Sequence, residues 1–235
     1  MKVAVLTTDT THHTYYVRKV SERFPLQAIV LERWRAVAPF ETVHPFEQQR
    51  DEYEREVLLA GGPQSCTELP GVHHCDRVND HAIVAMLRET KPDVVLAFGT
   101  GRMTRDVFRS ADVACLNLHG GNPEEYRGLD SHLWAIYHHD FANLVSSLHL
   151  VDEQIDTGDL VFQSALDIPR GTELYQLRAI NAQACVEMSL RALETLSHGS
   201  LPAHKQRRRG RYYSHMPACL KQECLAKFRQ YTTRH

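Results

Sequence analysis

The stretch LNLHGG combines an amide, Asn117, and an imidazole, His119, at the end of the apolar run VACLNL. Residues two positions apart on a strand point to the same side, so both side chains should reach one crevice. An amide can donate a hydrogen bond to an oxyanion, and an imidazole can gain or lose a proton near neutrality. Taken alone, a histidine at a strand end is more often structural, so its role depends on what else reaches the crevice.

A carboxylate is the third candidate group. Asp156 lies in the segment IDTGD, a tight turn containing a glycine that follows an apolar strand. An aspartate, a histidine and an amide in one crevice provide a general acid or base, its orienting group and an oxyanion stabiliser. Asp152 and Asp159, considered individually, are typical of solvated turn residues.

The order of elements predicts how these groups are brought together. Short apolar runs alternate with segments of helical spacing from the N-terminus to His119. The predicted strands in this part are 1–8, 27–32, 93–99 and 113–119, and the predicted helices are 14–24, 47–62, 79–91 and 105–110. This alternation predicts an α/β fold with a doubly wound, mostly parallel sheet.

The pattern changes in the second half of the chain. Two strands, 145–152 and 159–168, are predicted on either side of the turn EQIDTG, and one long helix covers 172–199. The remaining residues contain the basic run KQRRRGR, the strand-like YYSHM and a short amphipathic helix. We therefore predict a catalytic domain over 1–199 and an appendage over 200–235. The apolar stripe of its helix must be buried against the domain or a second subunit.

Composition excludes several classes of protein. The net charge is −2 and hydrophobic residues make up 43%, so nothing favours a nucleic-acid partner. The N-terminus lacks the apolar region of a signal peptide and no apolar stretch is long enough to span a membrane, which predicts a cytoplasmic protein with no membrane partner. Six cysteines without a CxxC pair predict reduced, buried thiols.

Neither a phosphate-binding loop nor a metal motif is present in the sequence. No GxGxxG or GK[ST] pattern occurs, and the neighbouring histidines do not have HExxH spacing, so no metal site is predicted. The glycines after the strands 93–99 and 113–119 are expected to keep side chains out of one crevice if those strands are neighbours. These glycines are Gly99, Gly101, Gly120 and Gly121.

The segments NLHGGNPEEYRG and SSLHLVDEQIDTGDLVFQ resemble the 10-formyltetrahydrofolate-dependent formyltransferase family. The resemblance runs from about Pro92 to Gln163, and it includes an Asn-x-His pair and an aspartate in a downstream xxDxG turn. The positions in register with the family are Asn117, His119, Tyr126, Arg127, Gly128, His149 and Asp156. Gly120 and Gly121 replace the more common Pro-Ser of the family.

The resemblance implies a fold, a reaction and a set of site residues. It implies transfer of a formyl group from 10-formyltetrahydrofolate to an amine, with Asn117, His119 and Asp156 as catalytic residues. The proton-transfer roles of His119 and Asp156 remain open. The residues expected to bind the folate are Gly101, Arg102, Met103, Asp152 and Asp156. Those expected to bind the acceptor are His12, Tyr126, Arg127 and Gly128.

The acceptor is chosen by elimination within the family. Methionyl-tRNA formyltransferases carry a further C-terminal domain, glycinamide ribonucleotide transformylases a Gly-Asn-Gly-Ser-type loop, and formyltetrahydrofolate hydrolases an N-terminal regulatory domain. None of these is expected here, and the chain then resembles the sugar N-formyltransferases, which act on nucleotide-linked amino sugars and commonly form dimers. The resemblance therefore implies a homodimer to which the segment 200–235 contributes contact or substrate-binding surface. The alternatives are a glycinamide ribonucleotide-type transformylase, a non-catalytic folate- or nucleotide-binding protein and a metal-dependent hydrolase.

Overall fold

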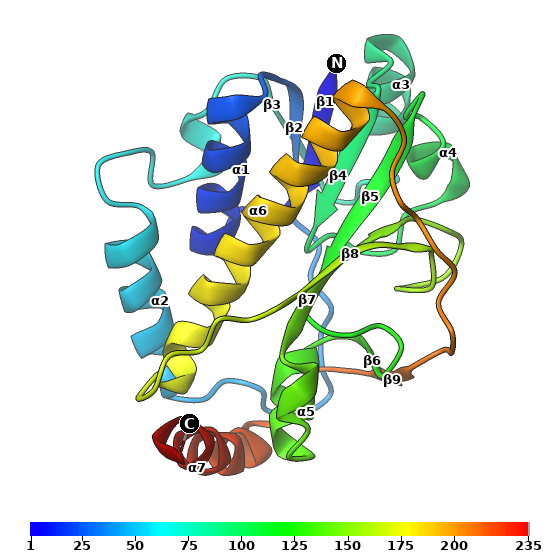
Figure 1. Cartoon of the computed structure of the whole chain (residues 1–235). Helices are drawn as coiled ribbons and strands as arrows, with labels where there is room; N and C mark the ends of the chain where they lie inside the picture. Colours follow the sequence, from blue (N-terminus) through cyan, green and yellow to red (C-terminus); the bar gives the residue numbers. More distant parts are fainter. Residues whose placement is uncertain (235) are drawn as a thin grey trace.

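A seven-stranded sheet runs through the centre of the molecule in the computed structural model, which describes residues 1–234 (Figure 1). Across the sheet the strands are β3 (Val72–Cys75), β2 (Leu26–Glu32), β1 (Val3–Thr7), β4 (Val94–Phe98), β5 (Ala114–His119), β7 (Val145–Leu150) and β8 (Leu160–Ala165). The first five pair in parallel, whereas β7 and β8 are antiparallel to their neighbours. The predicted α/β fold with a mostly parallel sheet is thus confirmed.

Both faces of the sheet are covered by helices, which explains why its strands are apolar throughout. On β1, Val3 and Val5 pack with α1 and α6, whereas Ala4 and Leu6 pack with α3 and α4 (Figure 1). The helices of the first face are α1 (Thr11–Arg23) and α6 (Leu177–His198), with α2 (Phe46–Leu58) beside them, and those of the second are α3 (His81–Thr90) and α4 (Arg105–Phe108). The predicted long helix begins later than expected, because 174–176 form a 3-10 turn.

Three elements were not predicted from the sequence. They are β3, the short strand β6 (Tyr126–Gly128) and α5 (Ser131–Tyr137). The exposed pair His73 and His74 lies in β3 at the edge of the sheet, where a strand needs little apolar character. No helix in residues 1–234 is long and apolar enough to cross a membrane.

The C-terminal segment returns to the predicted catalytic domain. Its strand β9 (Arg211–Tyr213) pairs in parallel with β6, and α7 (Ala218–Arg234) packs against α5. Cys224 and Phe228 of α7 are buried in a cluster with Ile136 of α5, so the helix covers apolar residues of its own chain. The domain boundary at 199 and the homodimer remain predictions. Five of the six cysteines are buried as predicted, but Cys219 of α7 is exposed.

Candidate active site

A cavity of about 420 Å³ opens beyond the carboxyl ends of β1, β4 and β5. In an open α/β sheet this is where ligands bind, because the strand order reverses there and the loops separate. The two segments that contain the expected folate-binding residues both line this first cavity, namely Gly101–Met103 and Asp152–Asp156 apart from Glu153. Asn117 and His119, the last alternating residues of β5, line it as well.

His119 is buried and held from both sides of its ring. Its Nε2 donates to the backbone carbonyl of Tyr126 at 2.7 Å, and its Nδ1 lies 3.5 Å from Oδ2 of Asp156. A neutral ring that donates to Tyr126 would present an Nδ1 lone pair to the carboxylate. A protonated ring would have an acceptor on each side, the Tyr126 carbonyl at Nε2 and the Asp156 carboxylate at Nδ1.

Asp156 lies at the centre of the polar cluster. Its backbone has a φ of 55°, a left-handed conformation that turns the side chain back toward β5. Its carboxylate accepts a hydrogen bond from the Gly128 amide at 2.8 Å. Burial by itself would raise the pKa of Asp156, but the His119 charge and the hydrogen bond from the Gly128 amide hold this pKa well below its usual range. Asp156 is therefore an anion at neutral pH and cannot donate a proton.

His149 completes the cluster, although the sequence analysis placed it only in register with the family and assigned it no catalytic or binding role. It lies directly opposite Asn117 in the antiparallel pair of β5 and β7, and its Nε2 is 3.5 Å from Asp156 Oδ1. Its Nδ1 donates to the Leu150 carbonyl at 2.7 Å, which leaves Nε2 to accept from Asn117 Nδ2 at 3.1 Å. The position within the family pattern was the available signal, but the contact depends on strand pairing.

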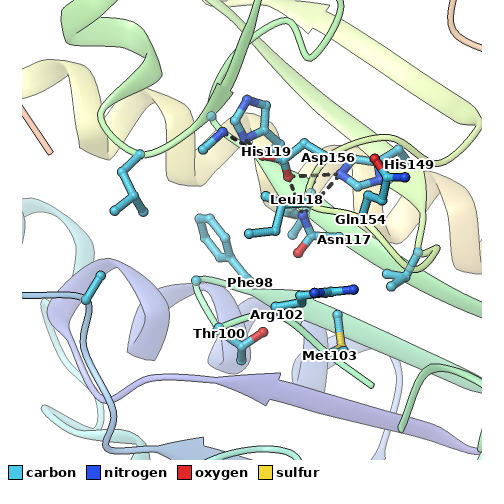
Figure 2. A pocket seen from close by; sticks show the side chains of 18 of the residues that line it. Phe98, Thr100, Arg102, Met103, Asn117, Leu118, His119, His149, Gln154 and Asp156 are labelled. Atoms are coloured by element: carbon cyan, nitrogen blue, oxygen red, sulfur yellow. Dashed lines mark hydrogen bonds and ion pairs between the residues drawn. The ribbon is translucent and has the colours of Figure 1, made fainter. Parts of the chain in front are cut away.

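The amide of Asn117 is oriented by these neighbours. Its Nδ2 faces His149 and also lies 3.4 Å from Asp156 Oδ1, while its oxygen points into the cavity (Figure 2). In this orientation Asn117 offers a hydrogen-bond acceptor to a ligand. The predicted donation to an oxyanion requires the amide to turn over, and this role remains a prediction.

The C-terminal segment holds the turn that carries Asp156. Gln206 donates through Nε2 to the carbonyls of Asp156 at 3.0 Å and Gly158 at 2.8 Å. Arg127 lies behind the same turn, donating to the carbonyls of Ile155 at 3.1 Å and Gly210 at 2.9 Å. The segment predicted as an appendage therefore supports the turn that carries Asp156.

Three of the four glycines expected at one crevice, Gly99, Gly101 and Gly120, line the first cavity. A Cβ on Gly99 would lie 2.5 Å from the His13 ring, and one on Gly101 would lie 3.1 Å from the Trp34 ring. These two glycines therefore also allow ring side chains to pack closely in the cavity wall. His12, predicted to bind the acceptor, lies buried in the same wall, with Nδ1 3.1 Å from Thr10 Oγ1.

Buried histidines surround this site in their neutral form. Burial and, next, the positive charge of Arg178 lower the pKa of His13 to about 3, and burial lowers the pKa of His132 to about 4. Burial also lowers the pKa of His12. These rings remain uncharged across the physiological range.

The buried neutral histidines predict acid sensitivity. In the unfolded chain these histidines take up a proton near pH 6.5, whereas in the folded chain the pKa is about 3 for His13 and about 4 for His132. The unfolded state therefore binds more protons, and the free energy of unfolding decreases as pH falls below 6.5. His13 and His132 should each contribute roughly 1.4 kcal/mol per pH unit near pH 5. Urea unfolding between pH 7 and pH 5 measures how steeply the free energy of unfolding changes with pH. His13→Asn should reduce this slope, whereas the control His138→Asn, at an exposed position, should leave it unchanged. Equal slopes in both variants would contradict the prediction.

A second cavity, of about 230 Å³, meets the first at His119. The residues that line both are His119, Gly120, Gly128 and Leu129. The second cavity has an apolar wall and a polar one; its further lining residues are Phe46, Arg50, Asp130, Ser131, His132, Leu133, Leu174, Leu177 and Arg178. Ser131 Oγ is buried and has no hydrogen-bond partner among the described residues. His119 thus stands between two spaces that could hold two different molecules.

Most of the chain matches a family of known proteins. The family model described as formyl transferase matches residues 1–193. A methionyl-tRNA formyltransferase of Clostridium beijerinckii is 25% identical over 140 residues, which are 59% of this chain and 45% of that protein. The chain thus spans less than half the length of this curated relative.

Solved structures share the fold at low sequence identity. A sugar N-formyltransferase from a Shewanella species superposes with a TM-score of 0.64 at 13% identity, covering 97% of this chain and 87% of the other. HypX from Aquifex aeolicus in complex with tetrahydrofolic acid has a TM-score of 0.56 at 18% identity, covering 94% of this chain and 31% of the other.

Proposed function

The chain belongs to the formyl transferase family, and from this premise we propose that it transfers a formyl group from 10-formyltetrahydrofolate to the amine of a small acceptor. The acceptor class we propose is a nucleotide-linked amino sugar. The observation that carries the proposal is the His119–Asp156 pair, with Asn117 beside it, at the junction of two cavities. Two cavities that meet at an acid/base pair suit a direct transfer between two bound substrates.

The first cavity suits the folate. Its wall combines apolar side chains, among them Phe98, Met103 and Leu118, with the backbone of two loops, which suits a flat ring with polar edges. Thr100 also lines it, and its buried Oγ1 has no hydrogen-bond partner among the described residues. An unpaired buried hydroxyl is costly unless a ligand supplies its partner.

The second cavity suits the acceptor. It reaches His119 from the other side and offers the unpaired Ser131 hydroxyl together with apolar side chains. A compact sugar ring has both kinds of surface. The names of structural neighbours, such as the sugar N-formyltransferase from Shewanella, support a sugar over other amines.

The polar cluster would perform the proton transfers of this reaction. The amine nitrogen of the acceptor would form a C–N bond to the formyl carbon, and the C–N bond between that carbon and the folate nitrogen would break. The proton that the acceptor nitrogen loses would be delivered to the departing folate nitrogen, so the transfer is balanced. His119, stabilised as a cation by Asp156, can hold a proton beside the negative charge that develops on the formyl oxygen. Asp156 keeps His119 oriented. The amide of Asn117 offers a hydrogen-bond donor and an acceptor to the reacting groups of the two substrates.

The direct test is a transfer assay with purified protein and 10-formyltetrahydrofolate. We expect a mass increase of one formyl group on nucleotide-linked amino sugars. Methionyl-tRNA belongs in the same panel because the sequence relatives carry that name, and glycinamide ribonucleotide represents the third class. Formylation of methionyl-tRNA alone would overturn the sugar proposal, and no transfer to any amine would favour a binding protein.

Hydrogen exchange tests where the folate lies. Adding tetrahydrofolate should protect backbone amides in 99–103 and 151–157, because these two loops line the first cavity. The exposed strand β3 lies outside that cavity and serves as the internal control. Protection confined to 12–16, or none in either loop, would contradict this placement.

A further inference from the structure

Three arginines surround a third cavity, of about 390 Å³, at the outer end of the first one. Its lining residues are Arg102, Arg127, Gln154, Ile155, Arg209 and Tyr212. Within residues 1–234, none of these three guanidinium groups forms an ion pair with a carboxylate. By contrast, the nearby Arg105 and Arg208 pair with Glu153 and Glu125.

Arg127 is the most unusual of the three, because its side chain is only 6% exposed. Its partners Ile155 and Gly210 are carbonyl groups, which do not neutralise its charge. Burial and then the charge of Arg209 lower the pKa of Arg127, against the opposing effect of Asp156. Two cations that line one cavity, neither of them ion-paired with a carboxylate within residues 1–234, raise the electrostatic energy of the folded protein, and a bound anion would offset it.

The position of the third cavity relates it to one substrate. It shares Arg102, Gln154, Ile155 and Tyr212 with the first cavity and no residue with the second. Tyr212 is 50% exposed and offers an aromatic surface at the boundary between them. A long molecule bound in the first cavity would leave it past Tyr212 and enter the space between the arginines.

We propose that Arg102, Arg127 and Arg209 form a subsite for the clustered carboxylates of an oligo-γ-glutamyl tail on the folate donor. This proposal rests on the proposed function, since it assigns the first cavity to the folate. Each further glutamate adds a carboxylate, and Arg209 lies in the basic run KQRRRGR, which adds further positive charge beside this cavity. Phosphates of a nucleotide-linked acceptor carry similar anionic oxygens, so the experiment must separate the two sources.

Calorimetry with tetrahydrofolate carrying one or five glutamates tests the proposal. In the wild type the pentaglutamate should bind roughly tenfold more tightly, the sum of several partly exposed ion pairs, and high salt should reduce this preference. Arg209→Gln should remove most of the preference while the monoglutamate affinity stays the same. Arg207→Gln is the matched control, because it removes the same charge from the same basic run but does not line the cavity.

Each other outcome overturns a defined part of the argument. Equal affinities for both glutamate lengths in the wild type would overturn the subsite and leave the proposed function intact. An equal loss in the Arg207→Gln and Arg209→Gln variants would show a general basic surface instead of this cavity. A nucleoside diphosphate whose binding depends on Arg209, with no effect of glutamate number, would assign the arginines to phosphate. If neither folate binds, the proposed function itself is wrong.

Discussion

Asp156→Asn should lower kcat by roughly 10²–10³-fold or more, the range found when a preorganised group that stabilises transition-state charge is removed. The asparagine keeps the size of the side chain and can still accept from Gly128, but it removes the charge that faces His119 at 3.5 Å. Without that charge, no carboxylate faces Nδ1 of His119 to stabilise a proton there during transfer. Steady-state kinetics at saturating folate and acceptor measure the effect.

Asp159→Asn is the matched control for this variant. Asp159 lies three residues along in the same segment and does not line the first cavity. Its kcat should be unchanged, and both variants should bind tetrahydrofolate with nearly the wild-type affinity. If Asp156→Asn retains near-normal turnover, the charge of Asp156 is not required and the acid/base cluster has been assigned wrongly.

His119→Ala should reduce turnover by a similar or larger factor, roughly 10²–10⁴-fold, because within residues 1–234 only the His119 imidazole lines both cavities. The truncation leaves a space beside Asp156 and the Tyr126 carbonyl into which free imidazole can fit. Added imidazole should therefore restore part of the activity. This recovery separates a chemical role from a purely structural one.

The exposed His138→Ala variant controls for loss of a histidine near the site. Its kcat should match the wild type. Near-normal turnover of His119→Ala at saturating substrates would show that proton transfer does not depend on this ring. Loss of folate binding in His119→Ala would instead point to a disturbed cavity, so affinity must be measured alongside kcat.

Gly120 and Gly121 depart from the family pattern. For Gly121 the reason is steric. A Cβ on Gly121 would lie 2.8 Å from the Cβ of Ser131 and 3.0 Å from Nε2 of His119. Helix α5, which begins at Ser131, therefore approaches the end of β5 too closely for any larger residue. Ser131 in turn reaches the second cavity, so this local change bears on which acceptor fits there.

Local patterns in the sequence determined most of the sheet and the first members of the site. Strands buried on both faces must be apolar over their whole length, and this made β1, β4 and β5 recognisable without any tertiary information. Alternation along β5 placed Asn117 and His119 on one side, and the turn IDTGD identified Asp156. These inferences needed only neighbours within a few residues, so the sequence alone supported them.

The tertiary structure decided which segments distant in the sequence come into contact, because no local sequence pattern records this. The pairing of β7 with β5 put His149 opposite Asn117, and the return of the C-terminal segment brought Gln206 to the Asp156 turn and Arg209 toward Arg127. Periodicity reports which face of an element is buried, but not which distant element covers it. Contacts across such separations follow from strand order and from the path of the chain, because only these determine which charges and hydrogen-bonding groups meet.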